Sequence, residues 1–198
     1  MTAQWVFVCG PSGVGKDSVI AWAVKALTSQ PEIVFARRLI TRPAQPTSDH
    51  DAIGEHDFLL LQQSGGLRWC WQAHGFYYGI SQHYASHVSA GGIVVVNGSR
   101  GHVDGLPAAP DVKRVEITAS PEVIASRLTE RGRDTLQEVQ QRLARNASLE
   151  ETDPKKVDLR INNDGELAEA GSVLATYLAT LAAQAGINVP LTRPRTTS

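Results

Sequence analysis

A glycine-rich stretch near the amino terminus constrains the fold of this chain more than any other feature. It comprises Gly10, Pro11, Ser12, Gly13, Val14, Gly15 and Lys16, with Asp17 and Ser18 directly after it. A β-rich run over residues 4–9 precedes the stretch, and a helical pattern over residues 16–27 follows it. Between a strand and a helix, such a loop cradles polyphosphate with backbone N–H groups, and its lysine reaches the β- and γ-phosphates. We therefore predict that residues 10–18 bind ATP and that Lys16 is catalytic.

The residue after the lysine departs from this pattern. A Ser or Thr hydroxyl normally binds Mg²⁺ there, but this chain has Asp17 followed by Ser18. The apolar run over residues 93–96 also ends in Asn97, where a metal-facing aspartate is expected. One hypothesis is that the metal-side carboxylate has moved to Asp17, which makes Asp17 and Ser18 candidate Mg²⁺ ligands. The alternative is that Asp17 only caps the first helical turn, and the sequence leaves both open.

Strand and helix signals alternate along the whole chain. Further strands are indicated over residues 33–39, 93–96, 115–118 and 157–161, and helices over residues 81–90, 120–131 and 166–183. The unbroken apolar run at 93–96 is typical of a central parallel strand buried on both faces. The pattern predicts an α/β, three-layer P-loop kinase fold with a mainly parallel central sheet, a lid and an acceptor-binding insertion.

The 198 residues fit one domain, which we place at 1–187. Its core is expected at about 4–40, 91–126 and 157–183, the acceptor-binding region at about 41–85 and the lid at about 127–146. Residues 41–66 are polar and lack a long apolar period, so we expect an insertion or flap there rather than core. The tail at 188–198 is expected to be disordered.

Composition excludes several classes of protein. Lys and Arg number 19 against 20 for Asp and Glu, which argues against a nucleic-acid partner. Two cysteines make neither a disulfide framework nor a zinc site, which fits a reducing cytosol. The amino terminus lacks a basic signal-peptide region, and no apolar run is long enough to cross a bilayer. We expect a soluble, cytoplasmic protein without a membrane partner, and a homodimer is left open.

Arginines form two groups that suit phosphate chemistry. Arg127 and Arg131 share a helix face, where like charges repel unless an anion lies between them, and Arg142 follows on the next helix. We predict that these three residues are catalytic and close over the transferring phosphoryl group, although solvated surface charges are the alternative. Arg38, Arg42 and Arg100 lie near the ends of predicted strands, where ligands gather in α/β folds. They are candidate ligands of a phosphorylated acceptor.

In order and spacing, several segments resemble the guanylate kinase family over about residues 4–180. These are the glycine-rich loop, Thr41-Arg42-Pro43, Gly75 to Gly79, Arg127-Leu128 through Asp134, Arg142-Leu143 and Asn162-Asn163-Asp164. The resemblance implies ATP–Mg²⁺ as phosphoryl donor and a nucleotide contact by Asn163. The family's two guanine-reading carboxylates fall at Trp69 and near Ser99, however. Without these hydrogen-bond acceptors for the guanine N–H groups, the enzyme should lose most of its activity towards GMP.

The segments in which this chain departs from guanylate kinase resemble a second group, the ribose 1,5-bisphosphate phosphokinases of phosphonate catabolism. They are Gly15-Lys16-Asp17, Thr41-Arg42-Pro43-Ala44, Trp71 to Gly75 and Val96 to Arg100. That family makes 5-phosphoribosyl 1-diphosphate from ATP and ribose 1,5-bisphosphate. The implied partner is therefore a small phosphorylated sugar, which has two phosphates and no base.

Remaining candidates on the acceptor side are Tyr78, His74 and Ser99. Tyr78 is expected to hydrogen-bond a phosphate, and Ser99 lies in the matching segment before Arg100. His74 either contacts the acceptor or packs as a structural histidine among the nearby aromatic residues. Trp69 and Trp71 alternate along a short strand, so we expect one of them in the core.

Other functions stay open at this point. The nearest is a nucleoside monophosphate kinase with altered base choice. A catalytically inactive phosphopeptide-binding module has no need for the loop and lysine that this chain keeps. A nucleotide-sensing regulator that binds ATP without turnover is a third possibility.

Overall fold

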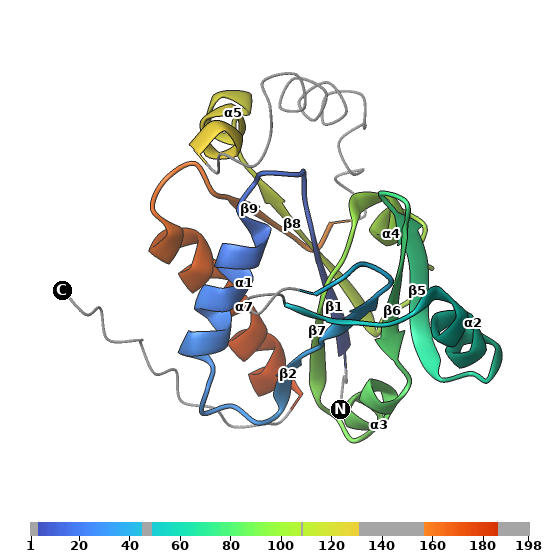
Figure 1. The fold of residues 1–198 in the computed structure, drawn as a ribbon. Coiled ribbons are helices and arrows are strands. Elements are labelled where there is room, and N and C mark those ends of the chain that lie inside the picture. Colours follow the sequence, from blue (N-terminus) through green and yellow to red (C-terminus); the bar gives the residue numbers. More distant parts are fainter. Residues whose placement is uncertain (1–3, 45–48, 108, 131–156, 186–198) are drawn as a thin grey trace.

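A five-stranded parallel sheet forms the centre of the molecule (Figure 1). The structure is a computed structural model, and it describes residues 4–44, 49–107, 109–130 and 157–185. The strand order is β2-β7-β1-β8-β9, and each neighbouring pair runs parallel. The strands are β1 (Gln4–Cys9), β2 (Ile33–Phe35), β7 (Ile93–Asn97), β8 (Val112–Thr118) and β9 (Leu159–Asn162). The predicted α/β class and mainly parallel sheet are confirmed.

Both faces of this sheet are buried, which explains the continuous apolar runs in its strands. On β1, Val6 and Val8 face one hydrophobic cluster while Trp5 and Phe7 face another. The first face is covered by α1 (Lys16–Ala26) and α7 (Leu167–Gln184), which lie side by side in Figure 1. The second is covered by α3 (His83–Ser89), α4 (Arg100–Asp104) and the hairpin of β5 (Leu67–Ala73) and β6 (Phe76–Ser81).

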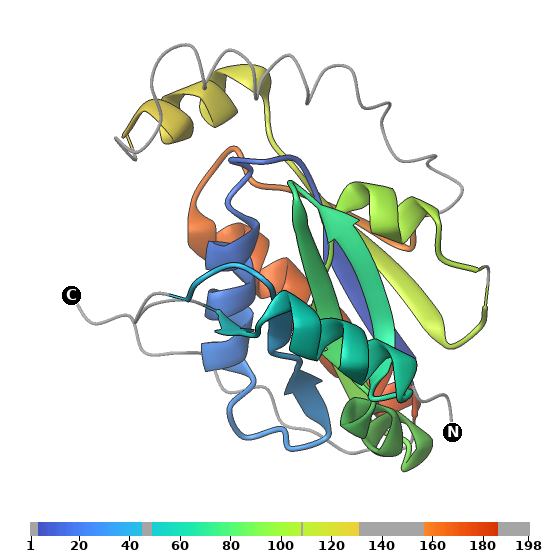
Figure 2. The same cartoon turned by 45° about the vertical axis from the view of Figure 1, so that its right-hand side comes forward.

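A second, mixed sheet lies on that side of the molecule, and the sequence did not predict it. Its order is β4-β3-β6-β5, with β3 (Arg38–Ile40) parallel to β4 (His50–Ala52) and antiparallel to β6. Beside it runs α2 (Glu55–Gln63), seen along the second sheet in Figure 2. Phe58 of α2 and Ile40 of β3 are fully buried, so the second sheet and its helix enclose buried side chains of their own. The insertion or flap expected at residues 41–66 stays a prediction. Phe58 is the only buried residue of α2, too sparse a pattern to show a period.

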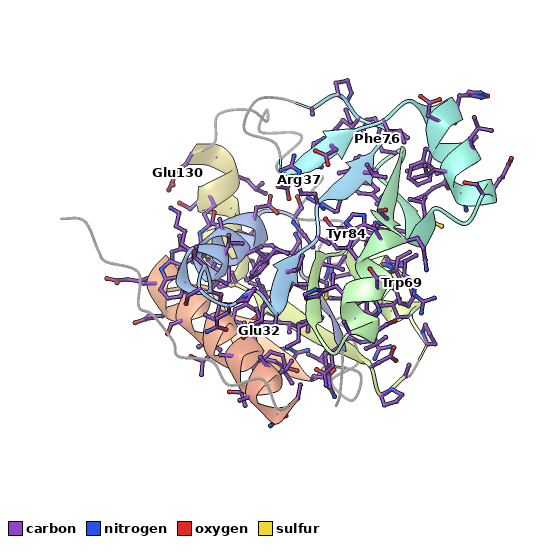
Figure 3. The ribbon with its side chains drawn as sticks, turned by 90° about the horizontal axis from the view of Figure 1, so that it is seen from below. Glu32, Arg37, Trp69, Phe76, Tyr84 and Glu130 are labelled. Atoms are coloured by element: carbon purple, nitrogen blue, oxygen red, sulfur yellow. The ribbon has the colours of Figure 1, made fainter. Side chains whose placement is uncertain are left out.

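The chain changes sheets at Ala36 and Arg37, which splits the single strand expected over residues 33–39. The Ala36 amide still donates to Val95 of the central sheet, whereas the Arg37 amide donates to the Tyr84 hydroxyl. Figure 3 shows Arg37 and Tyr84 near each other, with Glu130 and Trp69 on opposite sides of the molecule. Arg38 consequently begins β3 just beyond the carboxyl end of β2. That edge of a parallel sheet is where α/β folds bind ligands.

Among the described residues, no helix is long and apolar enough to span a membrane.

Candidate active site

The glycine-rich loop follows β1 and turns directly into α1. Gly13 and Gly15 have φ angles of +87° and +86°, in the left-handed region that favours glycine. A Cβ atom at Gly15 would lie 2.6 Å from Nδ2 of Asn163, and one at Gly13 would lie 2.9 Å from Cγ of Leu128. Backbone conformation and lack of space therefore both require glycine at these positions.

Two side chains from distant parts of the chain hold the loop through the carbonyl oxygen of Val14. Asn163, directly after β9, donates to it from Nδ2 at 2.7 Å. Arg127, on α5 (Pro121–Glu130), donates from Nη1 at 3.3 Å. Asn163 is only 2% exposed, so its described contact is with the loop backbone. Its direct contact with a nucleotide, and the role of Arg127 in phosphoryl transfer, stay predictions.

Lys16 is the first residue of α1 and lies among charged groups. Burial is the largest influence on its ammonium and lowers its pKa, while the neighbouring Asp17 carboxylate acts in the opposite direction. An incompletely solvated ammonium gains from an incoming anion, so this position favours a phosphate beside Lys16.

A hydrogen-bond network connects the loop with Arg38, through residues that are far apart in sequence. Nδ2 of Asn97, at the end of β7, donates to Oδ1 of Asp17 at 2.7 Å and to Oδ2 of Asp49 at 3.2 Å. Arg38 donates from Nη2 to the same Asp49 oxygen at 2.5 Å and from Nη1 to the Asn97 carbonyl at 3.4 Å. We call Asp17, Asn97, Asp49 and Arg38 the carboxylate network. It spans the predicted donor and acceptor sides of the site.

Asp17 does not cap α1 with its side chain. The N-cap residue is Gly15, and the helix has no side-chain cap hydrogen bond. The described partner of the Asp17 carboxylate is Asn97 instead, so the capping alternative loses its support. Ser18 is exposed in the first turn of α1, and its role at a metal ion stays a prediction.

Asp49 is the residue of this network that sequence reasoning missed. Burial is the strongest influence on its carboxyl group and would raise its pKa, but the charge and hydrogen bonds of Arg38, aided by Asn97, outweigh it. The net pKa of Asp49 is lowered, so the carboxylate stays ionised near neutral pH. No local signal marks Asp49, because its partners come from β3 and β7 and meet it only in the fold.

Beneath Arg38 lies a column of stacked rings. The Arg38 guanidinium is 6.0 Å from the centre of the Tyr78 ring, which stacks on Trp71 with centroids 5.4 Å apart. Trp71 in turn stacks on His102 at 4.4 Å. Tyr78 is 7% exposed, so the column is a wall behind Arg38 rather than a free surface. His102 was not identified from the sequence.

Trp69 joins this wall through edge contacts with Phe7 at 5.4 Å and with His102 at 6.3 Å between ring centroids. Both Trp69 and Trp71 pack against the same core cluster. The expectation that only one of them reaches the core was wrong, because residues two apart on a strand point to the same face.

Other predicted acceptor residues lie at different depths around the wall. Arg100 is buried at the start of α4, and the Ser99 hydroxyl caps that helix by accepting from the His102 amide at 3.3 Å. Arg42 is exposed after β3. His74 is exposed in the two-residue turn between β5 and β6, with a φ of +53°, so it is not the packed structural histidine of the alternative interpretation. Contacts of Arg100, Ser99, Arg42 and His74 with an acceptor stay predictions.

Arg131 and Arg142, predicted to be catalytic, lie outside the described residues.

Full-length sequence relatives decide the family. A protein from Burkholderia pseudomallei strain K96243, named ribose 1,5-bisphosphate phosphokinase PhnN, is 42% identical over 182 residues, covering 89% of this chain and 96% of the relative. The chain belongs to the ribose 1,5-bisphosphate phosphokinase family. It is thus a member of a family of phosphotransferases. No family model matches the chain.

Two further relatives carry the same name. The ribose 1,5-bisphosphate phosphokinase of Agrobacterium fabrum strain C58 is 36% identical, with 87% of this chain and 94% of the relative covered. The one from Laribacter hongkongensis strain HLHK9 is 42% identical over 89% of this chain. The chain spans only 43% of that longer relative.

Solved structures agree on the fold that this phosphokinase family member adopts. Guanylate kinase from Anaplasma phagocytophilum superposes with a TM-score of 0.69 at 16% identity, covering 90% of this chain and 86% of that one. A sugar kinase from Janibacter sp. HTCC2649 gives a TM-score of 0.53 at 18% identity, covering 92% and 98%. At these identities the likeness concerns the fold alone.

Proposed function

We propose that this chain transfers the γ-phosphoryl group of ATP to the 1-phosphate of ribose 1,5-bisphosphate, giving 5-phosphoribosyl 1-diphosphate and ADP. The observation that carries the proposal is the make-up of the acceptor side. Arg38 lies there above a wall of aromatic rings, and Trp69, at the position of a guanine-reading carboxylate in guanylate kinases, packs against Phe7 and His102. Cationic and apolar groups suit a phosphorylated sugar better than a purine, whose N–H groups need acceptors.

In this reaction an oxygen of the acceptor's 1-phosphate attacks the γ-phosphorus of ATP, and the bond from the γ-phosphorus to the β,γ-bridging oxygen breaks. Lys16 and the backbone N–H groups of the glycine-rich loop hold the β- and γ-phosphates through that displacement. Arg127, which already contacts the loop at Val14, offsets charge on the transferring group together with Arg131 and Arg142. Bound Mg²⁺ supplies further neutralisation of phosphate charge, with Asp17 and Ser18 as proposed ligands.

The acceptor is held by the residues near the carboxyl edge of the sheet. Arg38, Arg42 and Arg100 bind its phosphates, and Tyr78, His74 and Ser99 are proposed to contribute hydrogen bonds. A cytoplasmic location and a homodimer remain predictions beside this proposal.

The deciding experiment measures ADP release from ATP and Mg²⁺ with ribose 1,5-bisphosphate and GMP offered in parallel. We expect fast turnover with the bisphosphate and little with GMP. Faster turnover with GMP would favour a nucleoside monophosphate kinase. No turnover with either acceptor would favour a binding module or a nucleotide sensor.

Arg38 provides the sharpest test of the acceptor side. Arg38→Met should raise the KM for ribose 1,5-bisphosphate at least tenfold, because truncating one partner of a buried charge pair costs about 2–5 kcal/mol. The KM for ATP should change less. The matched control is Arg37→Met. Arg37 is exposed, and its partner Asp51, at 2.7 Å, does not belong to the carboxylate network. Equal KM values for both variants would rule out acceptor binding by Arg38.

A further inference from the structure

We infer that Asp49 is a further ligand of the Mg²⁺ that accompanies ATP, and that it shares this ion with Asp17 and the amide oxygen of Asn97. This inference rests on the proposed kinase function. It adds a residue, Asp49, that the sequence did not identify as a metal ligand. Its starting point is the centre of the carboxylate network. There, the Asp17 and Asp49 carboxylates lie within hydrogen-bond distance of one nitrogen, Nδ2 of Asn97.

Two anionic groups that converge on one point need positive charge between them. In the described structure the partly positive NH₂ group of Asn97 supplies part of it, at 2.7 Å from Asp17 and 3.2 Å from Asp49, and the Arg38 guanidinium donates to the same Asp49 oxygen at 2.5 Å. A divalent cation satisfies two carboxylates far better than an amide does, and carboxylate oxygens are ligands that Mg²⁺ prefers. The amide is therefore the chemical stand-in for a cation at this point.

The other end of the same amide supplies an independent observation. Asn97 is only 7% exposed, and its Oδ1 atom is buried without a hydrogen-bond partner among the described residues. A buried amide oxygen without a partner is costly, so this end of the Asn97 side chain would gain from a ligand. A half-turn of the amide exchanges nitrogen for oxygen and presents three oxygen atoms to one cation, from Asp17, Asp49 and Asn97.

Protein side chains alone would not complete such a site. The described residues contain no group of three or more His, Cys, Asp or Glu side chains suited to a metal ion. Mg²⁺ in phosphoryl-transfer enzymes is held by one or two carboxylates together with substrate phosphates and water. Lys16 begins the helix that carries Asp17, which places the network beside the expected β- and γ-phosphates.

The test measures metal binding directly and needs no acceptor and no turnover. The full chain is saturated with the non-hydrolysable analogue β,γ-imido-ATP and titrated with Mn²⁺, and free Mn²⁺ is followed by electron paramagnetic resonance. We expect Asp49→Asn to weaken Mn²⁺ binding at least tenfold. The matched control is Asp51→Asn, the same substitution two residues later, within β4, at an exposed aspartate paired with Arg37. It should stay within twofold of wild type.

A second variant keeps the test informative if Asp49→Asn folds poorly. Asn97→Asp replaces the amide by a third carboxylate and should tighten Mn²⁺ binding while lowering the melting temperature of the metal-free chain. Unchanged Mn²⁺ affinity in folded Asp49→Asn would overturn the inference and leave Asp49 as a positioning residue for Arg38. Because no acceptor is present, failure here is distinguishable from a wrong acceptor assignment.

Discussion

At the scale of single residues, the carbonyl oxygen of Val14 is the point on which the phosphate loop is fixed. Asn163 and Arg127 reach it from β9 and α5 and donate hydrogen bonds at 2.7 and 3.3 Å. The space between these donors and the loop is so small that the backbone of Gly15 fills it. The loop conformation therefore depends on residues more than a hundred positions away in the chain.

Gly15→Ala should consequently damage the site. A non-glycine residue in the left-handed region costs about 1–3 kcal/mol, and the new methyl group would collide with Asn163. We expect a lower melting temperature and weaker ATP binding by calorimetry. Gly101→Ala is the control, because no atom lies within 4 Å of a Cβ at that position. Equal losses in both variants would contradict the argument.

His102 gives the fold a dependence on pH. Its burial in the ring column lowers its pKa to about 4 from an ordinary value of 6.5. Between these values the unfolded chain binds more protons than the folded one, so His102 stabilises the fold above pH 6.5 and this contribution is lost as pH falls towards 4. After discounting for partial exposure, we expect about 1 kcal/mol between pH 7 and pH 5.

Urea unfolding of wild type and His102→Phe at both pH values measures this effect. The wild type should lose more free energy of unfolding than the variant on acidification. The same loss in both proteins would assign the acid sensitivity to the carboxylates instead.

At the scale of elements, α1 and α7 pack closely against each other. A Cβ atom at Gly171 of α7 would lie 2.5 Å from Cδ2 in the Trp22 ring of α1. Glycine inside a helix is unfavourable by about 0.5–1 kcal/mol relative to alanine, so its presence indicates that packing outweighs propensity here.

Gly171→Ala should therefore lower the free energy of unfolding by about 1–3 kcal/mol through overpacking against Trp22. In a Trp22→Ala background the collision disappears, and the same substitution should become stabilising by a few tenths of a kcal/mol or more. Denaturant unfolding of the four proteins in this cycle tests the coupling. Equal effects of Gly171→Ala in both backgrounds would show that Trp22 is not the obstacle.

At the scale of the whole molecule, the glycine-rich loop and the buried apolar strands were enough to predict the parallel sheet. The second sheet was not predictable in the same way, because β3 and β4 have only three residues each and show no period. The candidate site was likewise predictable only in part. Lys16 and Arg38 stand out in the sequence, whereas Asp49 and His102 acquire their partners only when β7, α4 and the β5–β6 hairpin come together.

The ring wall also has a spectroscopic consequence. Of the four tryptophans, Trp5, Trp69 and Trp71 belong to the layer behind Arg38, while Trp22 packs into the opposite layer with α7. Replacing Trp22 by Phe would leave a chain whose tryptophan fluorescence arises from the layer behind Arg38 alone. The chain thus carries its own optical reporter of acceptor binding, and no attached dye is needed.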